Sequence, residues 1–113
     1  MGLWPTRTLE SGVVVICPQG RLNMSVAPVM REELHRLVDS GNSRIVVDLS
    51  NVETIDSSGL GALISGLKAA RQAGGDLRIA EAGDQVAAVL ELTNLDRILQ
   101  SYESAERAFD DPD

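Results

Sequence analysis

The sequence contains few of the residues that build disulfides, metal centres and general-base sites. Among its 113 residues it has one cysteine, Cys17, and one histidine, His35. A single cysteine excludes an internal disulfide and suits a reducing compartment, and the apolar run beside it predicts a core position. His35 has no predicted nucleophile or orienting partner nearby, so we expect it on the exposed face of a helix. We expect no metal site and no bound cofactor.

Positive charge and long apolar runs are also scarce. Lysine and arginine number 10 against 17 aspartates and glutamates, which gives a formal net charge of -7. Such a chain has little attraction for phosphate backbones, so nucleic acid is not an expected partner. No apolar run approaches the roughly 20 residues that span a bilayer, and the N-terminus has no signal-peptide pattern. We expect a cytoplasmic protein that does not bind a membrane.

Apolar periodicity and turn residues predict one α/β domain. Sheet-forming segments separated by helices imply parallel pairing in the sheet interior. We expect a mixed central sheet of about five strands with about four helices over residues 1–109, and a polar, frayed tail at 110–113. Ser25 is the expected cap of the first helix, and Asn94 should adopt the left-handed conformation that closes the third. The expected strands cover residues 6–9, 13–17, 44–49, 76–80 and 97–102, and the expected helices cover 25–41, 57–73, 84–94 and 104–109.

The chain is organised around the stretch Val46–Gly61. This stretch predicts a buried strand, a short polar crossing and the first turn of a helix. Asp56 and Ser57 are both good N-cap residues. The small serines and glycines that follow add little bulk, so another protein's backbone or a nucleotide could approach this helix end closely. The turn should fall beyond the carboxyl end of a central strand, which is the usual ligand edge of an open α/β sheet.

Ile55–Gly61, with Gly20–Leu22 upstream and Gly74–Gly75 at the end of the helix, resembles the STAS family, specifically its bacterial anti-sigma factor antagonists. The resemblance extends in element order over nearly the whole chain. It implies a protein that binds an anti-sigma factor, itself a serine kinase, and that is inactivated by phosphorylation at Ser57, with Ser58 as the second choice. A serine phosphatase would act on the phosphorylated form. The implied partner-binding residues are Asn23, Asp56, Ser57, Ser58, Gly59, Leu60 and Gly61.

A phosphate at this helix end has a physical reason to act as a switch. It adds about -1.5 to -2 charges, which the helix macrodipole and free N–H groups tolerate, so the fold should survive. Asp56 repels the new charge, and a partner packed against the turn would have to desolvate it, so binding should fail. In the family an aspartate is common at the position of Asn23. Asparagine keeps the cap and turn chemistry of that aspartate without its charge.

Other interpretations of the same residues stay open. Gly59–Ile64 nearly matches the dinucleotide fingerprint, with Glu81 at the spacing of its acidic residue, which leaves weak nucleotide contact open. Serine hydrolase chemistry would need a glycine in place of Ile55 and would have only His35 as base, so we expect no enzyme. Ser57 and Ser58 could simply cap their helix. Within the same family, the chain could instead be a STAS docking subunit of a transporter or lipid-transport ATPase complex, without a phosphorylation cycle.

Overall fold

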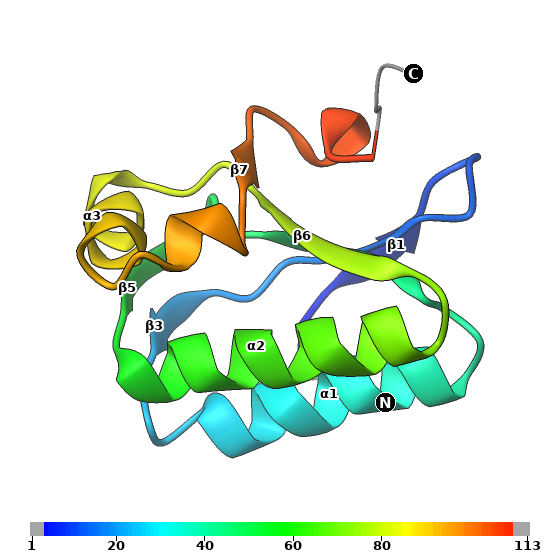
Figure 1. The fold of residues 1–113 in the computed structure, drawn as a ribbon, viewed down its shortest axis with the longest axis horizontal. Coiled ribbons are helices and arrows are strands. Elements are labelled where there is room, and N and C mark those ends of the chain that lie inside the picture. Colours follow the sequence, from blue (N-terminus) through cyan, green and yellow to red (C-terminus); the bar gives the residue numbers. More distant parts are fainter. Residues whose placement is uncertain (1–3, 110–113) are drawn as a thin grey trace.

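A five-stranded mixed sheet forms the centre of the molecule (Figure 1). The computed structural model describes residues 4–109, so the expected tail at 110–113 lies outside the described part. The strand order is β1-β2-β4-β6-β7, with β1 antiparallel to β2 and every other pairing parallel. The central position of β4 and the mixed α/β class are confirmed. The strands are β1 Thr6–Thr8, β2 Val14–Ile16, β4 Arg44–Asp48, β6 Asp76–Ala80 and β7 Ser101–Tyr102.

Two helices lie side by side on one face of this sheet, α1 (Ala27–Asp39) and α2 (Ser57–Gln72) (Figure 1). Their predicted apolar stripes are buried against the strands, and each large aliphatic side chain so buried contributes about 1.5 to 3 kcal/mol. Gly66 lets α1 approach, since a Cβ there would lie 2.6 Å from Leu34 Cδ1. The principal contributors to this core from the two helices are Met30, Leu34, Leu37, Leu60, Leu63, Leu67 and Ala70.

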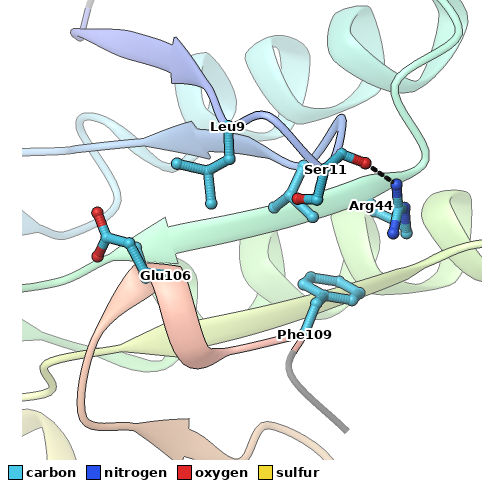
Figure 2. A pocket seen from close by; sticks show the side chains of 7 residues that line it. Leu9, Ser11, Arg44, Glu106 and Phe109 are labelled. Carbon is cyan, nitrogen blue, oxygen red and sulfur yellow. Dashed lines mark hydrogen bonds between the residues drawn. The ribbon is translucent and has the colours of Figure 1, made fainter.

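The C-terminal segment covers the other face of the sheet. Its short 3₁₀ helix η2 (Ala105–Arg107) and the residues beside it close over a smaller apolar cluster that includes Val15 and Val46. Figure 2 shows Phe109 and Glu106 of this segment across a cavity of about 110 Å³ from the turn between β1 and β2. The carbonyl of Ser11 in that turn accepts a hydrogen bond from Arg44.

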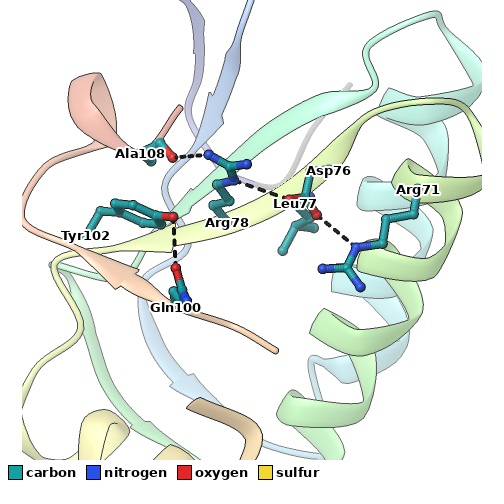
Figure 3. A network of polar contacts seen from close by, with 7 residues as sticks. All are labelled: Arg71, Asp76, Leu77, Arg78, Gln100, Tyr102 and Ala108. Carbon is teal, nitrogen blue, oxygen red and sulfur yellow. Dashed lines mark hydrogen bonds and ion pairs between the residues drawn. The ribbon is translucent and has the colours of Figure 1, made fainter. Parts of the chain in front are cut away.

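Arg78 on β6 anchors this C-terminal segment (Figure 3). Its Nη1 donates a hydrogen bond of 2.9 Å to the Ala108 carbonyl, and its Nε lies 3.2 Å from a carboxylate oxygen of Asp76. The guanidinium centre also lies 4.4 Å from the ring centroid of Phe109 and 5.9 Å from that of Tyr102. Such cation–π contacts contribute about 0.5 to 2 kcal/mol according to how far they are desolvated. Residues 105–109 are therefore part of the fold.

Three expected local features are wrong in detail. The expected strand at 97–102 is paired only over Ser101–Tyr102. Before it the chain forms a 3₁₀ turn, η1 (Leu95–Arg97), and the amides of Ile98 and Leu99 both donate to the Leu95 carbonyl instead of to a strand. The expected helix at 104–109 is likewise reduced to η2. Ser25 does not cap α1, whose N-cap is Val26 without any side-chain hydrogen bond. The left-handed Asn94 after α3 (Asp84–Leu92) is confirmed, with a φ of 59°.

The structure contains a second, two-stranded parallel sheet that the sequence pattern does not indicate. It pairs β3 (Gly20–Leu22) with β5 (Val52–Ile55), so the expected polar crossing contains a strand. The sequence predicts that Ser57 follows a strand of the central sheet. It follows β5 instead, which belongs to the two-stranded sheet. From α3, Gln85 Oε1 accepts a hydrogen bond of 3.0 Å from the Ile55 amide, and Gln85 Nε2 lies 3.4 Å from the Ile55 carbonyl oxygen. The amide side chain satisfies a strand edge that would otherwise lack a partner.

Gly59 and Gly61 differ in their surroundings. A Cβ at Gly59 would collide with the backbone carbonyl of Leu22 and lie 2.8 Å from Ile55 Cγ1, whereas a Cβ at Gly61 would meet nothing within 4 Å. Gly59 thus allows the first turn of α2 to pack against β3 and β5. Gly61 instead leaves open space on the outside of the helix.

This difference predicts opposite effects of alanine at the two positions. Gly59→Ala should lower the free energy of unfolding by about 1 to 3 kcal/mol, because the neighbouring backbone must shift. Gly61→Ala should leave it unchanged or raise it by about 0.5 to 1 kcal/mol, since alanine is the better helix former. Urea denaturation followed by circular dichroism measures both. Equal stabilities of the two variants would contradict the packing described here.

Cys17 at the end of β2 is half-buried rather than fully in the core. Its Sγ lies 3.9 Å from a carboxylate oxygen of Asp48, and the other oxygen of Asp48 accepts a hydrogen bond of 2.9 Å from the Ser50 amide. Burial, and then the negative charge of Asp48, raise the pKa of the Cys17 thiol, against the smaller opposing effect of Arg7. The thiolate is therefore disfavoured in the folded protein.

Alkylation by iodoacetamide tests this effect. A raised pKa leaves less thiolate at a given pH, so at pH about 8.5 Cys17 should react at least about threefold more slowly in the folded protein than in urea. Asp48→Asn should accelerate the folded-state reaction, while Asp39→Asn on the exposed face of α1 should not. Mass spectrometry of the alkylated fraction gives the rates. A folded rate equal to the unfolded rate would rule out the raised pKa.

Candidate functional site

The pairing of β3 with β5 brings two distant turns together. Leu22 and Ile55 are partners in the register, and the Asp56 amide donates a hydrogen bond of 3.3 Å to the Leu22 carbonyl. Asn23 follows Leu22 and Asp56 follows Ile55, so the turns that begin α1 and α2 lie next to each other. The structure thus places the predicted residues Asn23 and Asp56–Gly61 at one end of the molecule, where both helices start (Figure 1).

Of the two predicted N-cap residues, Asp56 is the one that caps α2. Its Oδ1 accepts hydrogen bonds of 2.9 Å from the Ser58 amide and 3.1 Å from the Gly59 amide, and its carbonyl accepts one of 3.0 Å from the Leu60 amide. The cap leaves Ser57 as the first helical residue, exposed to solvent. Among the residues that the structure describes, none forms a hydrogen bond with the Ser57 hydroxyl. The hydroxyl is therefore not used in capping the helix.

Ser58, Gly59 and Leu60 lie progressively further inside. Ser58 is half-buried, Gly59 is buried and packs against β3, and Leu60 is 3% exposed in the main core. Leu60 and Gly59 support the turn from within, whereas Ser57 and Gly61 present its outer surface. The amide of Gly59 is already bonded to Asp56, so it is not free to hold a nucleotide phosphate in the manner of a glycine-rich loop.

Asn23 shapes the neighbouring turn. Its Oδ1 accepts a hydrogen bond of 3.0 Å from the Ser25 amide, and its carbonyl accepts bonds from the amides of Val26 and Ala27 at 3.1 and 2.9 Å. This is the turn chemistry expected of asparagine. The loop so formed presents Met24, whose side chain is 72% exposed.

An open cleft of about 360 Å³ separates the first turns of the two helices. The predicted partner-binding residues that line this cleft all lie on its α2 side. The residues on its α1 side, Met24, Pro28 and Arg31, were not predicted. The signal available was the loop that follows Asn23, whose exposed methionine precedes the apolar stripe of α1. The cleft is lined by Met24, Ala27, Pro28, Arg31, Ser57, Ser58 and Gly61.

His35 has a partner that the sequence did not indicate. It is half-buried on α1, and its Nε2 lies 2.8 Å from the hydroxyl of Ser65 on α2. The expectation of an exposed position without a neighbouring hydroxyl is therefore wrong. Neither residue lines the cleft, and the hydrogen bond joins the two helices.

Residues 4–109 contain neither a metal-binding cluster of side chains nor a membrane-spanning helix. Within that range no group of three or more histidine, cysteine, aspartate or glutamate side chains has the geometry to hold a metal ion. The same residues include no helix of the length and apolarity that crossing a bilayer requires.

Comparison with known proteins gives a consistent family. The STAS domain model matches residues 5–108. A Thermotoga maritima protein assigned as an anti-sigma factor antagonist is 33% identical over 96% of this chain and 96% of its own length. The anti-sigma-B factor antagonist of Staphylococcus aureus is 32% identical over 77% of this chain and 81% of its own.

Solved structures agree with these relatives. The crystal structure of an anti-sigma factor antagonist from Thermotoga maritima superposes with a TM-score of 0.87 at 31% identity, covering 96% of this chain and 92% of that one. The predicted resemblance is thereby confirmed over nearly the whole described fold. The chain belongs to the STAS domain family, and the Thermotoga maritima and Staphylococcus aureus relatives above carry the name of anti-sigma factor antagonists.

Proposed function

We propose that this protein is an anti-sigma factor antagonist controlled by phosphorylation at Ser57. In its unmodified form it binds an anti-sigma factor that is also a serine kinase, and this frees a sigma factor for transcription. Phosphorylation of Ser57 ends the binding, and a serine phosphatase restores it. The protein acts by binding and not by catalysis.

One observation carries the proposal: Ser57 is exposed at the edge of an open cleft, and its hydroxyl has no hydrogen-bond partner among the described residues. The Asp56 side chain accepts the capping hydrogen bonds of α2, so the Ser57 hydroxyl is not needed as a cap. A kinase can therefore reach the hydroxyl without unwinding α2. Transfer would form a bond between Ser57 Oγ and the γ-phosphorus of ATP, break the bond to ADP and release the hydroxyl proton.

The cleft also has the composition of a protein-docking site. Met24 and Pro28 are exposed and apolar, and methionine adapts its shape to a partner surface. Ser57, Ser58 and Gly61 on the opposite wall are small, which allows a partner's backbone to come close. An apolar rim with small residues beside it supports tight packing of the unmodified form.

A phosphate at Ser57 would oppose that packing. It adds about -1.5 to -2 charges directly beside the carboxylate of Asp56, and a partner covering the cleft would have to strip water from it. The fold is not threatened, because Ser57 is exposed and no hydrogen bond of the described residues involves its hydroxyl. Modification would thus separate binding from stability.

Three serine variants test the proposal against the candidate anti-sigma factor. Ser57→Ala should bind with unchanged affinity and accept no phosphoryl group from ATP, whereas Ser57→Asp should bind at least about tenfold more weakly, a loss of about 1.4 kcal/mol. Ser58→Ala is the matched control and should still be phosphorylated. Calorimetry gives the affinities and intact mass gives the modification. Equal affinity of Ser57→Ala and Ser57→Asp, or modification of Ser57→Ala, would overturn the assignment.

A further inference from the structure

The cleft beside Ser57 contains one charged side chain, that of Arg31. Arg31 is exposed on α1, and none of the residues that the structure describes forms a hydrogen bond or ion pair with its guanidinium. The other arginine of α1 differs, because Arg36 Nη2 lies 2.7 Å from a carboxylate oxygen of Glu33. The chain has a net charge of -7, yet this arginine has no carboxylate partner among the described residues. Its guanidinium is therefore available to bind an anion at the candidate phosphorylation site.

The space between Arg31 and Ser57 is unobstructed. The two helices start side by side, α1 at Ala27 and α2 at Ser57. Arg31 and Gly61 each lie one turn after the start of their helix, and both line the cleft. No atom would lie within 4 Å of a Cβ at Gly61, so the arginine side chain can cross this position. A larger residue at 61 would narrow that passage.

The helix end itself offers a phosphate little compensation. The amides of Ser58 and Gly59 are bonded to Asp56, and the amide of Leu60 is bonded to the Asp56 carbonyl. The Asp56 carboxylate adds a negative charge next to the phosphate. The macrodipole alone stabilises a charge only weakly at an exposed site, so a nearby cation would add to its stabilisation.

We propose that Arg31 is the partner of phosphorylated Ser57, and that the two form an ion pair across the cleft within one molecule. The inference rests on the proposed function only in taking Ser57 as the phosphorylated residue. Arginine suits this role, because its planar guanidinium can bind two phosphate oxygens at once. The pair fills the cleft between Pro28 and Gly61, so phosphorylation closes the docking site as well as charging it. Arg31 then stabilises the released form over the bound form.

The test uses protein in which phosphoserine is inserted at position 57 during translation, so it needs neither kinase nor partner. Phosphorus-31 NMR follows the second ionisation of the phosphate in the parent phosphoprotein, in Arg31→Gln and in Arg36→Gln. Arg36→Gln is the matched control, because it removes the same charge from the same helix. Circular dichroism confirms that all three are folded.

An ion pair stabilises the dianion, so the second ionisation constant should be about three- to tenfold larger in the parent than in Arg31→Gln. Arg36→Gln should differ from the parent by less than about twofold, since its effect is only long-range and screened. Equal constants in the parent and Arg31→Gln, or equal changes in both variants, would overturn the pair. Neither result bears on whether an anti-sigma factor binds the unmodified protein, which the Ser57 variants test separately.

Discussion

The parallel pairing of β3 with β5 is the contact on which the geometry at Ser57 depends. It joins the loop after Leu22 to the turn after Ile55, two segments more than 30 residues apart, and so sets the starting points of α1 and α2 side by side. Gln85 satisfies the outer edge of β5, and Gly59 lets α2 pack against the carbonyl of Leu22. The cleft between the helices is a consequence of this arrangement.

Asp56 caps α2 and so leaves the hydroxyl of the exposed Ser57 without a hydrogen-bond partner among the described residues. The side chain of Asp56 accepts hydrogen bonds from two amides of the first turn, so the Ser57 hydroxyl has no part in capping the helix. A chemical change at that hydroxyl can therefore alter the surface without disturbing the core, where Leu60 and Leu63 are buried. Separation of a rigid interior from an adjustable surface is what a reversible binding switch requires.

Much of this fold could be predicted from the sequence, because the apolar stripes of α1 and α2 and the β-branched runs of β2 and β4 have clear periods. The short strands β3 and β5 could not, since three or four residues carry too little pattern to distinguish a strand from a loop. The motif predicts the α2 side of the candidate site. Arg31 and Pro28 were missed because their relation to Ser57 exists only once the helices pack, and the contact of His35 with Ser65 was missed for the same reason.

We propose that the unmodified protein docks on its partner through the cleft at the start of α1 and α2. Titration of the ¹⁵N-labelled protein with the candidate anti-sigma factor, followed by amide chemical shifts, locates the surface that is used. The perturbed amides should concentrate at residues 23–31 and 56–61. Perturbations confined to residues around exposed apolar side chains elsewhere, such as Leu92 at 83% or Ile98 at 45% exposure, would contradict this docking site.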